Sequence, residues 1–180
     1  MNILVCGMRD SGKTDLCKAY CYAEFDESEV EHEVKELGNK TIYTIEYLGY
    51  EVNFIDFKTT EDIFDFLQEP DMDIDAVMMT ISVTDGPMSP TCELITACLE
   101  AGFTNIVPML TKSDLEYDPE LLEIVSMECQ EAFEEAGYCD IVGDLPEVYQ
   151  ISSNKALYNP GNSWWEIMDA ALVTAMHNTL

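Results

Sequence analysis

Apolar residues follow two alternating patterns along this chain. Short, nearly continuous apolar runs are typical of buried strands, and longer segments with an apolar residue every three or four positions are typical of amphipathic helices. We expect strands over Asn2–Cys6, Thr41–Tyr47, Tyr50–Asp56, Asp75–Val83, Asn105–Leu110 and Glu147–Ile151. We expect helices over Lys13–Phe25, Thr60–Leu67, Ser89–Ala101, Asp118–Ala136 and Ser163–His177.

The order of these elements predicts the fold class. Alternating strands and helices, with strands that are apolar throughout, favour a mainly parallel sheet that helices cover on both faces. Leu48 and Gly49 separate two strand patterns and so predict a hairpin, which adds one antiparallel strand. We therefore expect an α/β fold, a three-layer sandwich around a six-stranded sheet. The length of 180 residues fits a single domain over residues 1–180.

A phosphate-binding motif follows the first strand. Residues Gly7-Met8-Arg9-Asp10-Ser11-Gly12-Lys13-Thr14 have the spacing G-x-x-x-x-G-K-[ST] between a strand and a helix, which predicts a P-loop NTPase fold. Glycines here let backbone N–H groups point at a phosphate, and the helix N-terminus adds its dipole. Lys13 can neutralise the β- and γ-phosphates during catalysis, and Thr14 can hold Mg²⁺. The residues expected at the phosphates are Arg9, Asp10, Ser11, Gly12, Lys13, Thr14 and Asp15.

The charge of the chain supports a phosphate ligand and argues against other partners. Eight Lys and Arg residues stand against 36 Asp and Glu residues, a formal net charge of −28. The one arginine, Arg9, lies with Lys13 in the phosphate motif, and Lys112 and Lys155 lie in two motifs described below. So acidic a chain would repel a triphosphate unless cations stay at its site. The same balance disfavours autonomous binding to nucleic acid and to anionic membranes.

The sequence favours a cytoplasmic protein. No apolar run reaches the about 20 residues that a membrane span needs. No basic segment precedes an apolar one near the start, so we expect no signal peptide. Seven cysteines without a framework spacing favour reduced thiols.

Polar residues follow the predicted strands at their carboxyl ends, where open α/β sheets bind ligands. Asp56 can hold Mg²⁺ through water or, alternatively, cap the next helix. In Thr111-Lys112-Ser113-Asp114, the Asp114 carboxylate can accept hydrogen bonds from guanine N1–H and the exocyclic amine, while the Lys112 stem covers the base. In Ser152-Ser153-Asn154-Lys155, backbone N–H groups can read guanine O6, or the segment is an ordinary Ser-rich turn.

Together these motifs resemble the GTP-binding domain of translational GTPases, and most closely that of elongation factor Tu. Asp85-Gly86-Pro87-Met88-x-x-Thr91 and the segment 120–128 are also similar to that family. The resemblance implies GTP and GDP as ligands with Mg²⁺ as cofactor. It implies that Thr14 binds Mg²⁺, that Lys112 and Asp114 read guanine beside Thr111, and that Ser152, Ser153 and Asn154 form the base loop.

The chain departs from the family at the residues that sense and hydrolyse GTP. The family has Asp-Cys-Pro-Gly-His where this chain has Asp56-Phe57-Lys58-Thr59-Thr60. Thr59 replaces the glycine whose N–H senses the γ-phosphate, and Thr60 replaces the histidine that positions water. In the shortened first switch, Thr41 is the candidate for the second Mg²⁺-binding threonine. The two β-barrel domains of tRNA-carrying family members have no counterpart in these residues.

Two hypotheses follow from this combination. The first is a guanine-nucleotide-binding protein whose GTP hydrolysis is slow or depends on a partner. The second is a pseudo-GTPase that acts as an interaction module and mimics elongation factor Tu toward a basic protein or another component of the translation machinery. The acidic segment Glu24–Glu36 is a solvated face or, under the second hypothesis, a docking surface.

Overall fold

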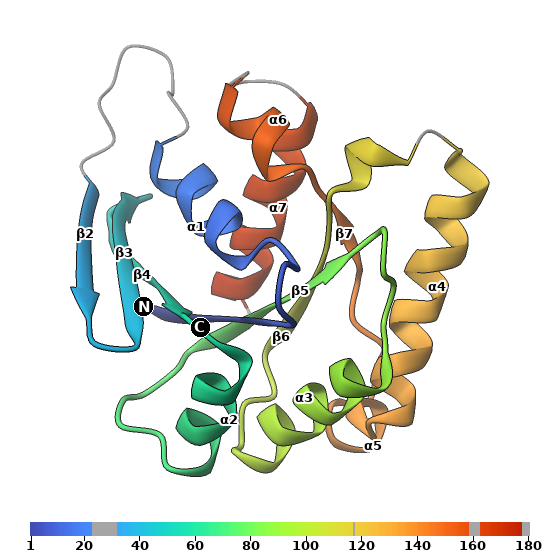
Figure 1. Ribbon diagram of the computed structural model, residues 1–180, viewed down its shortest axis with the longest axis horizontal. Coiled ribbons are helices and arrows are strands. Elements are labelled where there is room, and N and C mark those ends of the chain that lie inside the picture. The colour runs from blue at the N-terminus through green and yellow to red at the C-terminus, as the bar shows by residue number, and fades with distance from the viewer. Residues whose placement is uncertain (23–31, 117, 159–162, 178–180) are drawn as a thin grey trace.

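One seven-stranded sheet forms the centre of the computed structural model, which describes residues 1–180 except 23–31, 117, 159–162 and 178–180. The strands lie in the order β2-β3-β4-β1-β5-β6-β7 (Figure 1). Their bounds are Asn2–Gly7 for β1, His32–Leu37 for β2, Lys40–Tyr47 for β3, Tyr50–Phe57 for β4, Ala76–Ser82 for β5, Ile106–Thr111 for β6 and Tyr149–Gln150 for β7.

The sheet is mainly parallel, as predicted, but it has one strand more than the expected six. Strands β4, β1, β5, β6 and β7 pair in parallel, and β3 pairs antiparallel with both β4 and β2. The additional strand is β2, whose six residues are all exposed. Both its faces meet water, so its sequence HEVKEL carries no apolar alternation by which a strand could be recognised.

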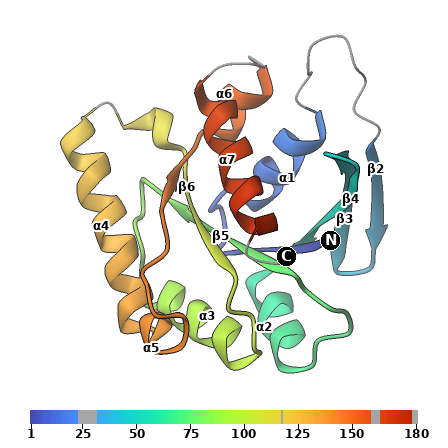
Figure 2. The same ribbon diagram turned by 180° about the vertical axis from the view of Figure 1, so that it is seen from behind.

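Helices cover both faces of the sheet and complete an α/β sandwich (Figures 1 and 2). One layer holds α1 (Lys13–Tyr22), α6 (Ser153–Tyr158) and α7 (Ser163–His177). The other layer holds α2 (Thr60–Gln68), α3 (Ser89–Glu100), α4 (Pro119–Glu135) and α5 (Tyr138–Val142), and a 3-10 turn, η1 (Ser113–Leu115), follows β6. No helix within the described ranges is long and apolar enough to cross a membrane.

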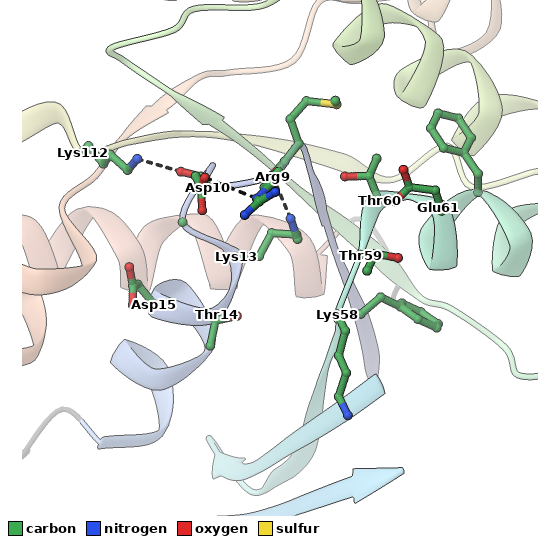
Figure 3. Close-up of a pocket in the computed structure, with 14 residues that line it drawn as sticks. Arg9, Asp10, Lys13, Thr14, Asp15, Lys58, Thr59, Thr60, Glu61 and Lys112 are labelled. Carbon is green, nitrogen blue, oxygen red and sulfur yellow. Dashed lines mark hydrogen bonds and ion pairs between the residues drawn. The ribbon is translucent and has the colours of Figure 1, made fainter. Parts of the chain in front are cut away.

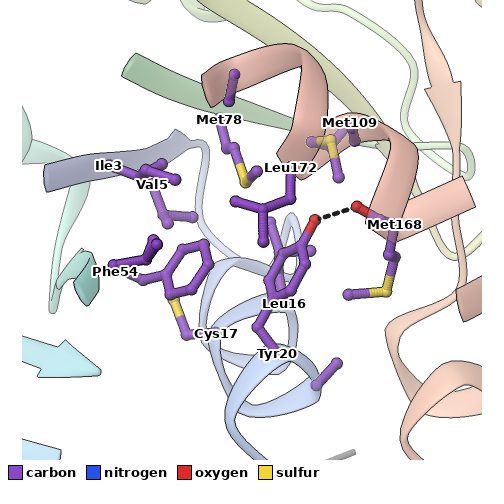
Figure 4. Packing of buried hydrophobic residues seen from close by; sticks show 14 of the residues in the cluster. Ile3, Val5, Leu16, Cys17, Tyr20, Phe54, Met78, Met109, Met168 and Leu172 are labelled. Carbon is purple, nitrogen blue, oxygen red and sulfur yellow. Dashed lines mark hydrogen bonds between the residues drawn. The ribbon is translucent and has the colours of Figure 1, made fainter. Parts of the chain in front are cut away.

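The hydrophobic core has two parts, one on each face of the sheet. On the α1 and α7 side, the Tyr20 ring stacks on Phe54 with 4.7 Å between centroids (Figure 4). The Tyr20 hydroxyl donates to the Met168 carbonyl oxygen at 2.7 Å, so its polar end is satisfied although the side chain is buried. This contact fastens α1 to α7 and holds the first helix, which begins at Lys13, against the sheet.

Most helices end within a few residues of the predicted bounds. The expected helix Lys13–Phe25 is described as α1 through Tyr22, and its last three positions lie outside the described residues. Of the acidic segment Glu24–Glu36, residues 24–31 also lie outside, while residues 32–36 belong to β2. Short helices α5 and α6 were not predicted, because five or six residues are too few to show a helical period.

Candidate functional site

A tight loop joins β1 to α1 at the carboxyl edge of the sheet. Its backbone takes positive φ at Gly7 (151°), Asp10 (60°) and Gly12 (92°). A Cβ atom on Gly7 would lie 2.2 Å from the Thr80 Oγ1 atom of β5, closer than any real contact allows. Glycine at position 7 is therefore required by close packing against β5, as well as by its backbone angle.

Hydrogen bonds to two neighbouring strands hold this loop. The Ser11 and Thr80 hydroxyls bond to each other at 2.7 Å, and Thr80 Oγ1 donates to the Cys6 carbonyl oxygen at 2.9 Å. From the end of β6, Thr111 Oγ1 donates to the Ser11 carbonyl oxygen at 2.6 Å. The side chains of Ser11 and Thr111, both predicted at the nucleotide, thus brace the loop against β5 and β6.

The Lys13 side chain folds back into the loop. Its Nζ atom donates to the carbonyl oxygens of Gly7 at 3.0 Å and Met8 at 2.8 Å. Burial lowers the pKa of Lys13, while the Asp56 carboxylate opposes that shift. The loop therefore holds a partly desolvated ammonium at its centre, where it is available to an anionic ligand.

The loop forms one wall of a cavity of about 890 Å³. The opposite wall is the segment after β4, which contributes Lys58, Thr59, Thr60 and Glu61 (Figure 3). Four of the eight cations of the chain line this one cavity: Arg9, Lys13, Lys58 and Lys112. The carboxylates of Asp10, Asp15 and Glu61 line the same cavity, and Arg9 forms an ion pair with Asp10 at 3.7 Å. The wall thus has four cationic and three anionic side chains, a local excess of positive charge in a protein of net charge −28, which favours an anion there.

Thr14 and Asp56 meet beside this cavity. The Thr14 hydroxyl donates to Asp56 Oδ2 at 2.6 Å, whereas Asp56 Oδ1 is buried without a hydrogen-bond partner among the described residues. Burial raises the pKa of the Asp56 carboxyl, and the Thr14 bond and the Lys13 charge oppose the rise. A hydroxyl next to a buried oxygen without a partner fits a hard cation such as Mg²⁺.

This pair alone does not form a complete metal site. Within the described part of the chain, no group of three or more His, Cys, Asp or Glu side chains is arranged to hold a metal ion. Mg²⁺ commonly takes one or two protein ligands and completes its shell with waters and phosphate oxygens. The Thr14 and Asp56 pair therefore suits a cation that arrives with a phosphate ligand.

Thr41 and Thr60 occupy different positions relative to the cavity. Thr60 begins α2 and lines the cavity. Thr41 lies in β3, directly across from Asp56 in the antiparallel register, and is absent from the residues that line the cavity. Strand pairing thus brings Thr41 close to Asp56 in the sheet without placing it at the cavity wall.

A capping box fixes the segment after β4, and it involves Thr59 instead of Asp56. Thr59 Oγ1 accepts a hydrogen bond from the Asp62 backbone N–H at 3.1 Å, and the Thr59 N–H donates to Asp62 Oδ2 at 3.2 Å. Asn39 adds a bond to Asp62 Oδ1 at 3.0 Å from the turn between β2 and β3. The alternative in which Asp56 caps this helix is therefore wrong, and the Thr59 N–H is bound to a carboxylate of its own chain.

A second, smaller cavity of about 260 Å³ adjoins the first. Lys112, with φ of 58°, lies between the two and donates from Nζ to the Asp10 carbonyl oxygen at 2.7 Å. The two cavities share Gly12, Asp15 and Lys112 as lining residues. The remaining residues that line the smaller cavity are Thr111, Asp114, Leu115, Ser152, Ser153 and Asn154.

The two loops of the smaller cavity are tied to each other. The Ser113 N–H donates to the Ile151 carbonyl oxygen at 3.0 Å, and Ser113 Oγ donates to the Leu110 carbonyl oxygen at 2.7 Å. Ser152 Oγ accepts from the Lys155 N–H at 3.2 Å and so closes the turn into α6. The strand-end residues predicted to read a base thus come together around one hollow, with the Asp114 carboxylate on its wall.

Sequence reasoning identified most of the residues that line the two cavities. It missed Met8, Phe57, Lys58, Glu61 and Phe64 of the larger cavity and Leu115 of the smaller one. Lys58 could have been found from its position directly after a strand end; Phe64 has no such signal, because it lies within a helix. No protein-family model matches the chain. Together the two cavities have cations and a constrained loop at one end and the Asp114 carboxylate at the other, with Lys112 between them.

Proposed function

We propose that this protein binds GDP and GTP across the two joined cavities, as a guanine-nucleotide-binding protein of the P-loop kind. One observation carries the proposal: Lys112, Gly12 and Asp15 are shared by two cavities, a larger one lined by four cations and three carboxylates and a smaller one that holds Asp114. A nucleotide has the same polarity, with anionic phosphates at one end and a base at the other. The resemblance to the GTP-binding domain of elongation factor Tu supports the same assignment.

Guanine recognition falls to Asp114 in this proposal. Its carboxylate is an acceptor only, so it pairs with the adjacent N1–H and amino donors of guanine. Adenine presents an acceptor at N1 and would leave the carboxylate facing a lone pair. Lys112 covers the base with its aliphatic stem, while backbone N–H groups of Ser152, Ser153 and Asn154 face O6.

At the phosphate end, the chain contributes charge and position. Lys13 and Arg9 neutralise phosphate oxygens, and loop N–H groups donate to them. Thr14 and Asp56 would hold Mg²⁺, directly or through water, which neutralises phosphate charge when it is bound. The residues present fit this ion because Asp56 Oδ1 is buried and has no hydrogen-bond partner in the described structure.

Hydrolysis by this site is slow or depends on a partner. Phosphoryl transfer to water needs a group that orients the attacking molecule. The lining of the larger cavity includes no histidine, and the residue nearest that role by resemblance is Thr60, whose hydroxyl is a weak base. Seven free cysteines and a nucleotide ligand fit action in the cytoplasm.

Substitution of Asp114 tests the proposal. Asp114→Ala leaves the guanine donors unpaired, so we expect GDP to bind at least about 100-fold more weakly. Asp114→Asn exchanges one acceptor for a donor and should shift preference toward xanthosine diphosphate, whose base carries a second carbonyl in place of the amine. Asp144→Asn, an exposed change of equal charge, is the control. Unchanged GDP affinity in Asp114→Ala would refute the assignment.

A second candidate function is a pseudo-GTPase that serves as a protein-interaction module and mimics elongation factor Tu. The bond between the Thr59 N–H and Asp62 favours it, because that donor is already occupied within the chain. A basic protein or a translation component would be its partner. If the protein has the same conformation and the same affinity for its partner with and without nucleotide, this function is favoured over a nucleotide-driven one.

A further inference from the structure

Positive charge is absent from one whole helical layer of the protein. The sequence has no lysine, arginine or histidine between Lys58 and Lys112, and none between Lys112 and Lys155. These two intervals contain helices α2, α3, α4 and α5, which together cover one face of the sheet (Figures 1 and 2). These four helices therefore carry no positive charge of their own, whereas the opposite layer carries Lys18 and Lys155. Lys40 of β3 reaches this face at Asp71, after the end of α2, where the two form an ion pair at 2.9 Å.

A groove lies in the middle of this face. It has a volume of about 820 Å³ and runs between α2, α3 and the C-terminal end of α4. Its lining is largely apolar and includes Phe64, Leu67, Cys92, Ala97, Ala101 and Ala136. Small side chains on α3 and α4 leave room that neighbouring helices do not fill, so the groove exposes apolar surface that a partner can bury.

Three carboxylates border this apolar floor: Glu93 and Glu100 on α3, and Glu135 at the end of α4. The ion pairs among the described residues join other side chains, so none of these three carboxylates is paired with a cation there. Two of them act on the apolar floor: burial is the main cause that raises the pKa of the Cys92 thiol, and the charges of Glu135 and Glu93 add to it. The groove thus combines apolar surface with a negative rim that lacks counter-charge.

We propose that this groove binds a basic amphipathic helix of a partner protein. The rim attracts lysine or arginine, and the floor takes apolar side chains spaced i, i+3, i+4 and i+7 along one face of a helix. The helices that line the groove use their backbone groups internally, so the occupant must satisfy its own backbone bonds, as a helix does. A second copy of this chain is disfavoured because it would bring the same acidic face.

The groove also touches the proposed nucleotide site. Phe64 lines both the groove and the larger cavity, and it lies on α2, whose first turn forms part of that cavity. A helix that fills the groove therefore contacts the element that follows the Asp56 strand. The proposal does not depend on nucleotide binding, however, because the groove and its rim exist without a ligand.

A fluorescent peptide tests the proposal. The probe is a synthetic helix of about 18 residues, long enough to be helical in water, with leucines on one face and lysines beside them. Its affinity for the full chain is measured by fluorescence anisotropy at about 150 mM salt, where distant charges are screened. In a second peptide, serine replaces every leucine while the charge is kept.

Matched variants locate the binding. Glu93→Gln with Glu100→Gln and Glu135→Gln removes three charges at the groove, and Glu36→Gln with Glu46→Gln and Glu166→Gln removes three exposed charges elsewhere. We expect about a tenfold or larger loss of affinity in the first triple variant and less than about a twofold loss in the second. Ala97→Phe, which fills the groove without changing charge, should also abolish binding.

Three results would overturn the proposal. Equal losses in the two triple variants would mean that the peptide responds only to net charge. Equal binding of the serine peptide would mean that the apolar floor is not used, and absence of binding to the unaltered protein would exclude this class of partner. GDP affinity is measured on the same samples, so failure of nucleotide binding is recognised separately.

Discussion

Replacing Gly7 with alanine tests whether the loop geometry is as tightly specified as its contacts indicate. The new Cβ would lie 2.2 Å from Thr80 Oγ1, 2.5 Å from Ser11 Oγ and 2.6 Å from the Thr80 carbonyl oxygen. The two hydroxyls can rotate away, but only by giving up their mutual hydrogen bond. The carbonyl oxygen belongs to the backbone of β5 and can move only if the sheet shifts.

Three costs add in this variant. Overpacking against fixed neighbours costs about 1–3 kcal/mol. A φ of 151° is a backbone region that alanine rarely adopts and adds about 1–3 kcal/mol, and the lost hydroxyl bond adds about 1 kcal/mol. We therefore expect the free energy of unfolding to fall by at least about 3 kcal/mol. This is a large part of the stability of a typical domain, which is about 5–15 kcal/mol.

The assay is urea unfolding followed by tryptophan fluorescence, because Trp165 is buried in the core beside Tyr20. Gly38→Ala is the matched control: Gly38 also has positive φ, at 64°, but a Cβ there would meet nothing within 4 Å. The control should lose only about 1–2 kcal/mol, the cost of the backbone angle. Equal losses in the two variants would refute the close packing of the loop against β5.

Further predictions concern the side chains of the site. Lys13→Met should weaken GDP binding at least about 100-fold in calorimetry, because it removes the ammonium at the centre of the loop. Asp56→Asn should abolish the Mg²⁺ dependence of GDP affinity, measured in the same way. Burial raises the pKa of the Asp56 carboxyl above its usual 3.8, so folding favours the protonated form. Without ligand, the free energy of unfolding of the unaltered protein, relative to that of Asp56→Asn, should therefore fall as the pH rises through the raised pKa. Urea unfolding of both proteins over a pH series measures this difference. Asp62→Ala frees the Thr59 N–H and should increase the ratio of GTP to GDP affinity, whereas an unchanged ratio would show that this donor does not face the γ-phosphate.

The comparison of sequence and structure shows where pattern reasoning works. Strands β1, β5 and β6 were predicted because they are buried on both faces and apolar throughout. The strand ends then placed Asp114 and Ser152–Asn154 on one hollow, since parallel strands end at the same edge of a sheet. Neither result required long-range information beyond the order of the elements.

The errors have physical reasons as well. The strand β2 is exposed along its whole length, so only pairing with β3 identifies it. The helix cap was assigned to Asp56 as an alternative, although Thr59 and Asp62 have the spacing of a capping box, a local signal that was available. Two features depend on packing between segments that are distant in the sequence: the register that sets Thr41 across from Asp56, and the groove between α2, α3 and α4. Patterns within a single sequence do not predict such packing.

Calorimetric titration of nucleotide-free protein with GDP, GTP and ATP, with and without Mg²⁺, tests the central claim most directly. The account predicts that GDP and GTP bind at least about 100-fold more tightly than ATP, because Asp114 pairs with guanine and repels adenine, and that Mg²⁺ strengthens binding through Thr14 and Asp56. Equal affinity for ATP, or no heat with any of the three nucleotides, would contradict it.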